Sequence, residues 1–291
     1  MGSTTLRRLA VALAAATFLL SATSCTSDDA AADSDAASGG EAAPTYLALG
    51  DSVPFGYRGG ATEDFPDAEN FVGYPELVAE ELGFDLLNAS CPGETSGSFQ
   101  DATAQSNGCE NTLNGPDGYR TAYPLHVEYD GADQSQLDYA KQALKDGDVD
   151  LVTLQIGAND AFLCQQTTAS GCSTAEDLQQ VGQTVQDNLD QILLGLRNDA
   201  GYNGQIVVVT YYALNYSDPT GLAIQALDNG IAQIAGRYAA DIADGYAAFK
   251  PAADAAGGDS VAAGLVLPND VHPTDKGQQL LADAVTAVVD D

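Results

Sequence analysis

The sequence predicts an α/β fold in which a parallel sheet is covered by helices on both faces. Short apolar runs rich in β-forming residues alternate along the chain with longer segments of helical period, and this alternation is typical of βαβ units. One run, residues 206–209, is apolar throughout, as expected for a strand buried on both faces of such a sheet. We expect one α/β domain over residues 44–291, because this length suits one domain and is short for two.

Each predicted strand is a short apolar run bounded by polar or turn residues. The run at 206–209 is expected near the centre of the sheet. The strands are expected at Tyr46–Leu49, Asp85–Asn88, Leu151–Ile156 and Ile206–Thr210, with a short fifth strand near Asp241–Asp244.

Helices are expected where apolar residues recur at a spacing of three or four. The segment 98–133 contains Gly, Asn and Pro and has no sustained period, so we expect it to be irregular and to shape a substrate cleft. The helices are expected at Tyr74–Leu82, Gln136–Leu144, Ala175–Arg197, Gly221–Ala239 and from Thr274 to Val289.

The first residues are typical of an export signal. Arg7 and Arg8 precede an apolar stretch over residues 9–20, which is too short to span a bilayer, and residues 1–24 are expected to be removed. Cys25 follows small residues and looks like the lipidation site of a bacterial lipoprotein; simple secretion is the alternative. Residues 25–43 carry no large apolar side chain and are expected to form a disordered tether. Either way, we expect an extracytoplasmic protein.

The chain is strongly acidic, with 42 Asp and Glu, 10 Lys and Arg, and a formal charge of −32. Loss of the signal would remove Arg7 and Arg8 and no acidic residue. This charge argues against a nucleic-acid partner, because phosphate binding needs clustered Lys and Arg. Contact with a membrane is expected only through a lipid anchor at Cys25, since an acidic surface is repelled by anionic bilayers.

Four short segments carry the candidate chemistry. The first three each follow a predicted strand, so they are expected at the carboxyl edge of the sheet, where loops converge on one crevice. Together the four resemble the sequence blocks of the SGNH (GDSL) hydrolase family of esterases and lipases, and other parts of the chain look like secreted actinobacterial members. The segments are Gly50-Asp51-Ser52, Cys91-Pro92-Gly93-Glu94-Thr95, Gly157-Ala158-Asn159-Asp160 and Asp270-Val271-His272-Pro273.

The resemblance implies a three-layer α/β/α sandwich with a flavodoxin-like, parallel five-stranded sheet, the SGNH hydrolase fold. It also implies a carboxylic ester hydrolase that acts through an acyl-enzyme, without a cofactor or a metal. Ser52 is the expected nucleophile, because a serine on a tight turn is exposed to a base. The backbone N–H groups of Ser52 and Gly93 and the amide of Asn159 are the implied oxyanion donors. Asp51 is expected to be structural.

Two residues are candidates for a histidine base, because the chain has two histidines. His126 lies in the irregular segment and follows no predicted strand, whereas His272 stands before Pro273 at the start of the last predicted helix, so His272 is the expected base. The family pattern places the orienting acid three residues before the base, but that position holds Asn269. Either Asp270 orients His272 through a different turn of the loop, or the carbonyl of Asn269 does so.

Apart from Cys25, four cysteines remain, and an even count in an exported chain suggests two disulfides. We favour Cys91–Cys109 and Cys164–Cys172 among the three possible pairings, because each pair flanks a loop directly after a proposed active-site segment. A zinc site is the competing interpretation, but the chain lacks a C-x-x-C motif and histidines near these cysteines.

The substrate is expected to be a small-molecule or glycan ester, and the protein is expected to be a monomer. The sequence leaves the acyl chain and the alcohol open. A carbohydrate O-acetylesterase of the same fold is one alternative. A surface lipoprotein that binds a ligand without catalysis is the other, because the acid is displaced from the family position.

Overall fold

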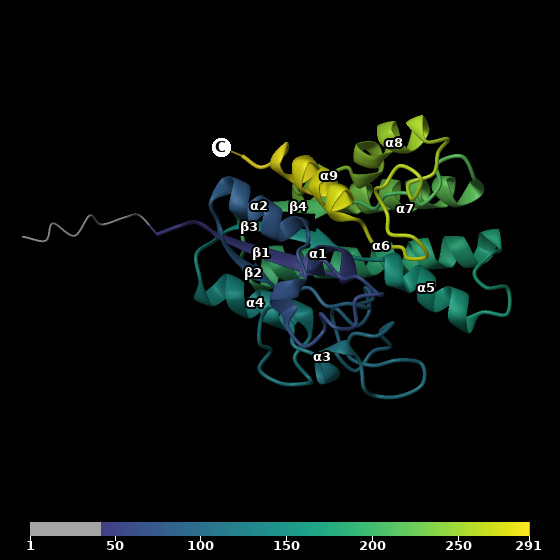
Figure 1. Ribbon diagram of the computed structural model, residues 1–291. Helices are drawn as coiled ribbons and strands as arrows, with labels where there is room; N and C mark the ends of the chain where they lie inside the picture. Colours follow the sequence, from purple (N-terminus) through teal and green to yellow (C-terminus); the bar gives the residue numbers. More distant parts are fainter. Residues whose placement is uncertain (1–41, 291) are drawn as a thin grey trace, which may run out of the picture. The chain divides into compact units, whose positions relative to one another are not determined.

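The computed structural model describes residues 42–290 and contains the predicted parallel sheet (Figure 1). Its strand order is β2-β1-β3-β4-β5 and all neighbouring strands are parallel, which is the flavodoxin-like order. The run at 206–209 lies in an inner strand, although β3 is the middle one. The strands are β1 (Thr45–Gly50), β2 (Asp85–Asn88), β3 (Val149–Gln155), β4 (Gln205–Val209) and β5 (Asp241–Ala243).

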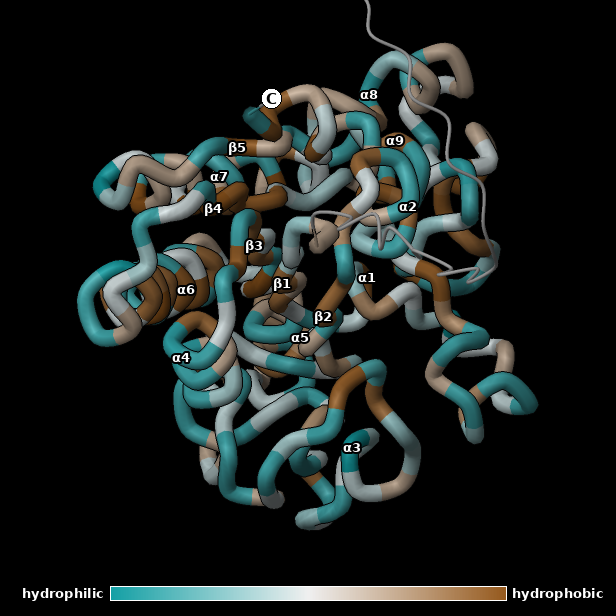
Figure 2. Tube along the Cα trace, turned by 90° about the vertical axis from the view of Figure 1, so that its left-hand side faces the viewer, coloured by the Kyte–Doolittle hydropathy of each residue, from teal (hydrophilic) through white to brown (hydrophobic). Residues whose placement is uncertain are grey.

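Helices cover both faces of the sheet (Figure 2). One apolar core joins the sheet to α4, α6 and α7, and a second joins its other face to α2, α8 and α9. The helices are α1 (Ser52–Phe55), α2 (Tyr74–Leu82), α3 (Tyr119–Ala122), α4 (Gln136–Asp146), α5 (Ala158–Thr167), α6 (Ala175–Leu194), α7 (Pro219–Ala235), α8 (Gly245–Ala255) and α9 (Asp275–Thr286), with short 3₁₀ or π turns η1 (Ala68–Asn70), η2 (Gly195–Asp199) and η3 (Gly236–Tyr238).

The alternation of side chains along the strands explains the two cores. In β1, Leu47 and Leu49 face one core while Tyr46 and Ala48 face the other, because successive side chains of a strand point to opposite faces. Every one of these residues is fully buried. The three-layer α/β/α sandwich expected from the sequence is therefore confirmed.

Capping explains where several helices begin. Helix α7 starts two residues before the predicted Gly221, because the Asp218 side chain accepts hydrogen bonds from the N–H groups of Thr220 and Gly221 and Pro219 takes the first helical position. Thr274 caps α9 by accepting from the N–H of Gly277, so that helix begins at residue 275.

Three helices around the sheet lie outside the ranges expected from periodicity: α1, α5 and α8. Helix α8 contains Pro251 in its interior, where proline is disfavoured. The segment 98–133 holds α3 as its one helix and is otherwise irregular, as expected. None of the helices within residues 42–290 has the length and apolarity needed to cross a membrane. The expected export signal and Cys25 lie outside the described residues, as does nearly all of the expected tether.

Candidate active site

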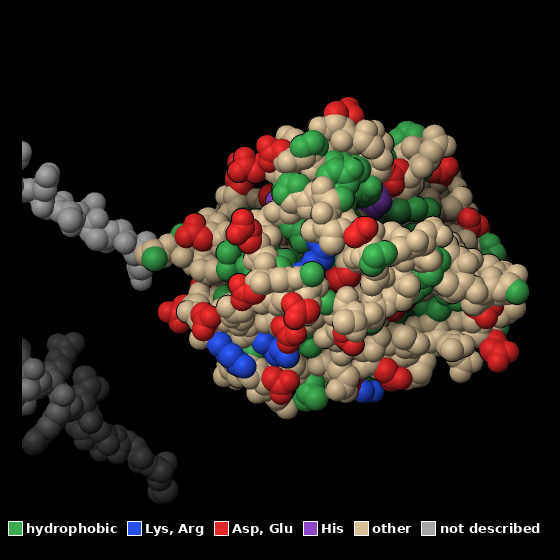
Figure 3. Space-filling model, turned by 90° about the horizontal axis from the view of Figure 1, so that it is seen from below, with side chains coloured by type: hydrophobic (Ala, Val, Ile, Leu, Met, Phe, Trp, Pro, Cys, Tyr) green, Lys and Arg blue, Asp and Glu red, His purple; other side chains and the backbone are tan. Residues whose placement is uncertain are grey.

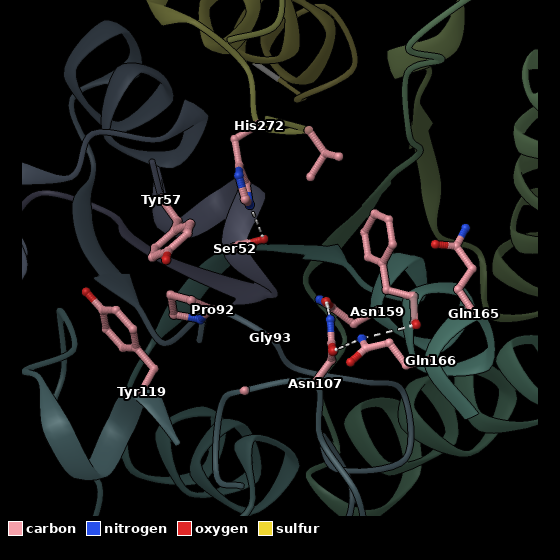
Figure 4. A pocket seen from close by; sticks show the side chains of 13 residues that line it. Ser52, Tyr57, Pro92, Gly93, Asn107, Tyr119, Asn159, Gln165, Gln166 and His272 are labelled. Atoms are coloured by element: carbon pink, nitrogen blue, oxygen red, sulfur yellow. Dashed lines mark hydrogen bonds between the residues drawn. The ribbon is translucent and has the colours of Figure 1, made fainter. Parts of the chain in front are cut away.

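The loops that follow β1, β2 and β3 meet the loop before α9 at a pocket of about 380 Å³. Figure 4 shows its lining. Members of all four sequence segments face it, among them Ser52, Gly93, Asn159 and His272. The carboxyl edge of the sheet therefore brings together residues that are as much as 220 positions apart in the chain.

The turn after β1 presents Ser52 to the pocket. Gly50 has a φ of 141°, and a side chain there would collide with the carbonyl oxygen of Gln155 on neighbouring β3. Glycine is therefore required for the chain to leave the sheet this closely. The Gln136 side chain bonds both the N–H and the carbonyl of Gly50. Sequence reasoning missed this role of Gln136, which α4 brings to the turn from outside the four segments.

Asp51 caps α1 and is not among the residues that line the pocket. One carboxylate oxygen accepts a hydrogen bond from the N–H of Val53 and the other from the hydroxyl of Tyr211. Burial raises the pKa of Asp51 to about 6, and these hydrogen bonds oppose the rise. Asp51 thus shapes the turn that carries Ser52, which agrees with the structural role expected for it.

His272 bridges Ser52 and Asp270. Its Nε2 lies 2.9 Å from Oγ of Ser52, and its Nδ1 lies 2.5 Å from Oδ1 of Asp270. A carboxylate only accepts hydrogen bonds, so Nδ1 carries the proton and Nε2 of the neutral ring accepts from the serine hydroxyl. In this tautomer the imidazole is ready to take the proton of Ser52.

The carboxylate of Asp270, and not the carbonyl of Asn269, contacts the ring. Asn269 has a φ of 59°, a left-handed conformation that asparagine tolerates better than most residues. Desolvation acts to raise the pKa of Asp270, but the hydrogen bond and charge of His272 and the N–H groups of Val271 and Gly59 lower it to about 2. The carboxyl is therefore ionised at neutral pH.

His126 lies outside the pocket lining, in accord with the choice between the two histidines. Its ring is 4.6 Å from that of Phe55, and its Nε2 donates to the Phe55 carbonyl. Burial lowers its pKa and this hydrogen bond opposes the effect. The position suits a packed neutral histidine.

The expected oxyanion donors face the pocket together. The N–H groups of Ser52 and Gly93 have no acceptor among the residues that the structure describes, and neither does Nδ2 of Asn159. Gly93 has a φ of 88°, and a side chain there would lie 2.7 Å from the carbonyl oxygen of Asn107. Three N–H donors beside a serine hydroxyl can stabilise an oxyanion formed on a carbonyl group.

The neighbour of Asn159, Asp160, ties two loops together. Its carboxylate accepts hydrogen bonds from the N–H and the hydroxyl of Ser96, at 2.9 and 2.6 Å. Asp160 thus fastens the start of α5 to the loop that follows β2.

Both disulfides predicted from the sequence are present, Cys91–Cys109 and Cys164–Cys172. The first ties the Gly93 loop to the segment that carries Asn107, and the second closes the loop after α5. Cys91, Glu94 and Cys109 form the one cluster of potential metal ligands within residues 42–290. Because its two sulfur atoms are bonded to each other, this cluster does not offer thiolates to a metal.

Aromatic and amide side chains form the pocket wall. Tyr57 packs edge-on against the His272 ring at 5.0 Å, and Tyr119 and Phe162 add further rings, beside the amides of Gln165 and Gln166. The molecular surface is acidic, and the face in Figure 3 carries many more Asp and Glu than Lys and Arg side chains. The lining itself contains no Asp, Glu, Lys or Arg, so the pocket suits an uncharged substrate.

Residues 48–280 match the GDSL-like lipase/acylhydrolase family. A variant of an acetyl-xylooligosaccharide esterase from Geobacillus stearothermophilus is similar in structure, with 19% identity, coverage of 84% of this chain and 93% of that one, and a TM-score of 0.52. Phospholipase A1 from Streptomyces albidoflavus is 19% identical, with coverage of 85% and 100% and a TM-score of 0.53. An extracellular lipase from Streptomyces rimosus is 21% identical, with coverage of 85% of this chain and 100% of that one and a TM-score of 0.51. No curated protein matches the sequence.

Proposed function

Because the chain belongs to the GDSL-like lipase/acylhydrolase family and is a carboxylic ester hydrolase, we propose that it cleaves esters through an acyl-enzyme on Ser52. The observation that carries the proposal is the hydrogen-bonded series from Asp270 through His272 to Ser52 at the pocket. A hydroxyl held by a neutral imidazole, whose other nitrogen is held by a carboxylate, is the arrangement of an activated serine.

In the first half-reaction, Nε2 of His272 takes the proton of Ser52 as Oγ attacks the ester carbonyl carbon. The carbonyl oxygen becomes an oxyanion and accepts hydrogen bonds from the N–H groups of Ser52 and Gly93 and from Nδ2 of Asn159. The bond to the alcohol oxygen then breaks, and His272 returns its proton to that oxygen. Asp270 holds the ring and stabilises its positive charge.

In the second half-reaction, His272 takes a proton from water as the water oxygen attacks the acyl carbon. The second tetrahedral intermediate collapses, the bond to Oγ breaks, and His272 returns the proton to Ser52. The carboxylic acid leaves. His272 carries every proton, so this reaction calls for no cofactor.

Substitution of Ser52 and of each histidine tests the assignment. Ser52→Ala is expected to abolish hydrolysis of p-nitrophenyl esters and labelling by a fluorophosphonate probe, while circular dichroism stays unchanged. His272→Ala is expected to lose activity, and His126→Ala to keep most of it. Turnover like that of the wild type in Ser52→Ala would refute the mechanism, and a loss that follows His126 would refute the choice of base. Absence of labelling in the wild type would favour a ligand-binding protein.

A carbohydrate O-acetylesterase is a second candidate. The amide side chains of Asn107, Gln165 and Gln166 and the ring of Tyr57 offer the hydrogen bonds and the aromatic surface that sugars use, and the acetyl-xylooligosaccharide esterase shares the fold. A panel of p-nitrophenyl esters beside acetylated xylan separates this candidate from a lipase.

Export belongs to the same proposal. Residues 1–24 would direct the chain out of the cytoplasm and be removed, and lipidated Cys25 would anchor it through a tether at 25–43; secretion without the lipid is the alternative. The two disulfides support this location, because disulfides persist in oxidising compartments. The enzyme would act as a monomer, and only the lipid would contact the membrane. Mass spectrometry of the mature N-terminus tests the anchor.

A further inference from the structure

Asn107 contacts two of the three loops that carry the proposed oxyanion donors, those of Gly93 and Asn159, although it belongs to none of the four sequence segments. Its backbone N–H donates to the carbonyl of Gly93 at 2.8 Å. Its side-chain Nδ2 donates to Oδ1 of Asn159, also at 2.8 Å. The Cys91–Cys109 disulfide closes the loop in which Asn107 lies.

A series of amides fixes the polarity of this contact (Figure 4). Nε2 of Gln166 lies 3.2 Å from the carbonyl oxygen of Phe162 and 2.8 Å from the Asn107 side chain. A backbone carbonyl only accepts, so the Gln166 atom beside it must be the NH₂ group. The Asn107 atom that faces this NH₂ group must then be its oxygen.

The same reasoning continues to the pocket. With its oxygen turned to Gln166, Asn107 presents NH₂ to Asn159, and the Asn159 atom that receives it must be Oδ1. Nδ2 of Asn159 is left free at the pocket. A flipped Asn159 would set its NH₂ against that of Asn107 and turn its carbonyl oxygen towards the oxyanion, where it would repel negative charge.

We propose that Asn107, anchored by Gln166, is a positioning residue that holds the Asn159 amide with its donor towards the reacting carbonyl. This inference rests on the proposed function, because it assigns Asn159 to the oxyanion. The donor is thereby oriented before substrate arrives, and such preorganisation is what makes an oxyanion donor effective.

Asn107→Asp tests the polarity with almost no change of shape. A carboxylate presents oxygen to Asn159 and so favours the flipped amide. We expect kcat to fall about 100-fold or more, as for loss of an oxyanion donor, with KM nearly unchanged. Asn107→Ala removes the preference of the Asn159 amide for one orientation without favouring the flipped one, so kcat is expected to fall about tenfold. A protonated carboxyl donates again, so the activity of Asn107→Asp relative to the wild type is expected to rise towards pH 5.

Gln166→Glu tests the same orientation from the next amide in the series, the one that contacts Asn107. Its carboxylate would draw the NH₂ of Asn107 towards itself, and Asn159 would flip in turn. Gln165→Glu adds the same charge one residue away, outside the amide series, and measures what the charge alone does. We expect the loss of kcat in Gln166→Glu to exceed that in Gln165→Glu at least fivefold. Equal losses would overturn the proposed anchor, and this comparison holds even if Asn107→Asp fails to fold.

A double-mutant cycle decides whether Asn107 acts through Asn159. In the Asn159→Ala background, the effect of Asn107→Asp on kcat is expected to shrink at least fivefold; a smaller reduction overturns the inference. Each variant is assayed at the same interval below its own thermal midpoint, so that a loss of stability alone does not imitate the result. Failure of the proposed function is distinguishable, because it would appear as full activity in Ser52→Ala.

Discussion

At the scale of the residue, one backbone conformation decides where the acid of the site lies. The left-handed backbone of Asn269 turns the loop so that Asp270, two residues before His272, reaches Nδ1. Asp270 also accepts hydrogen bonds from Val271 and Gly59. The carboxylate is therefore held from three sides, and its displacement along the sequence does not deprive His272 of a partner.

Asp270→Asn is expected to lower kcat/KM at least about 100-fold. The neutral amide can favour the wrong tautomer of His272 and no longer stabilises the imidazolium. The pKa of Asp270 is lowered to about 2, so the wild-type carboxyl stays ionised and the loss should persist across pH 6 to 9. The measurement is kcat/KM over this range at fixed salt. A loss under about tenfold, roughly 1.4 kcal/mol, would remove Asp270 from the catalytic group and leave Ser52 and His272 as a pair.

At the scale of the element, two closed loops support the pocket. The Cys91–Cys109 bridge joins residues 18 positions apart around the Gly93 turn, and Cys164–Cys172 closes eight positions at the end of α5. Helix α5 carries Asn159 in its first turn and Gln166 in its last. Residues from both ends of this helix therefore line the pocket.

Replacing each cysteine pair by serine is expected to lower the free energy of unfolding, by about 3 kcal/mol for the longer loop and about 2.5 kcal/mol for the shorter one. Only the first replacement should also lower kcat strongly, because it frees the segment that carries Asn107. The backbone N–H of Asn107 donates to the carbonyl of Gly93, so this hydrogen bond would be weakened as well. Urea unfolding and steady-state kinetics give the two quantities. A larger kinetic effect from the Cys164–Cys172 pair would mean that the end of α5 matters more than the Gly93 loop. Non-reducing peptide mapping establishes the pairing.

The same elements show what the sequence predicts well. Strand β2 and helix α2 have the predicted bounds, because each combines a clear apolar pattern with turn residues. Periodicity did not mark helix α5, because Asn159 is its one buried residue and the helix has no apolar stripe. The four chemical segments are local in sequence and were found. Asn107 and Gln136 act only through tertiary contacts, and the sole local signal for Asn107 is its place two residues before Cys109.

At the scale of the whole molecule, the buried carboxyl groups and the net charge both lower the stability of the fold as pH rises. Burial raises the pKa of Asp51 to about 6, that of Glu76 to about 7 and that of Asp228 to about 8, against hydrogen bonds that lower each. The folded protein thus holds protons that the unfolded chain releases near pH 4. The stability that these groups contribute is full below pH 4 and is lost as pH rises through 6 to 8. Repulsion within a chain of formal charge −32 grows over the same interval.

Asp228 offers the sharpest test of this coupling. Its Oδ1 accepts from the N–H of Tyr211, and its Oδ2 has no partner among the described residues. Asp228→Asn imitates the protonated acid, so the difference between its free energy of unfolding and that of the wild type should be smallest at pH 5, the lowest pH measured, and should grow as pH rises towards 8. At pH 9 the variant should be more stable, on the order of 2 kcal/mol, because it has no buried charge to form. That difference corresponds to roughly 4–8 °C in Tm for a domain of this size.

Glu80→Gln is the matched control, because Glu80 is exposed on α2 and its loss removes one charge without a buried group. Thermal melts of the three proteins at pH 5, 7 and 9, each in 20 and 300 mM NaCl, separate the two causes. Salt screens surface repulsion and should raise all three Tm values at pH 9, whereas the gain of Asp228→Asn over the control should persist in high salt, since a buried group is screened much less. If the Asp228→Asn and Glu80→Gln melts fall in parallel with pH, the net charge alone accounts for the pH dependence and Asp228 does not contribute to it.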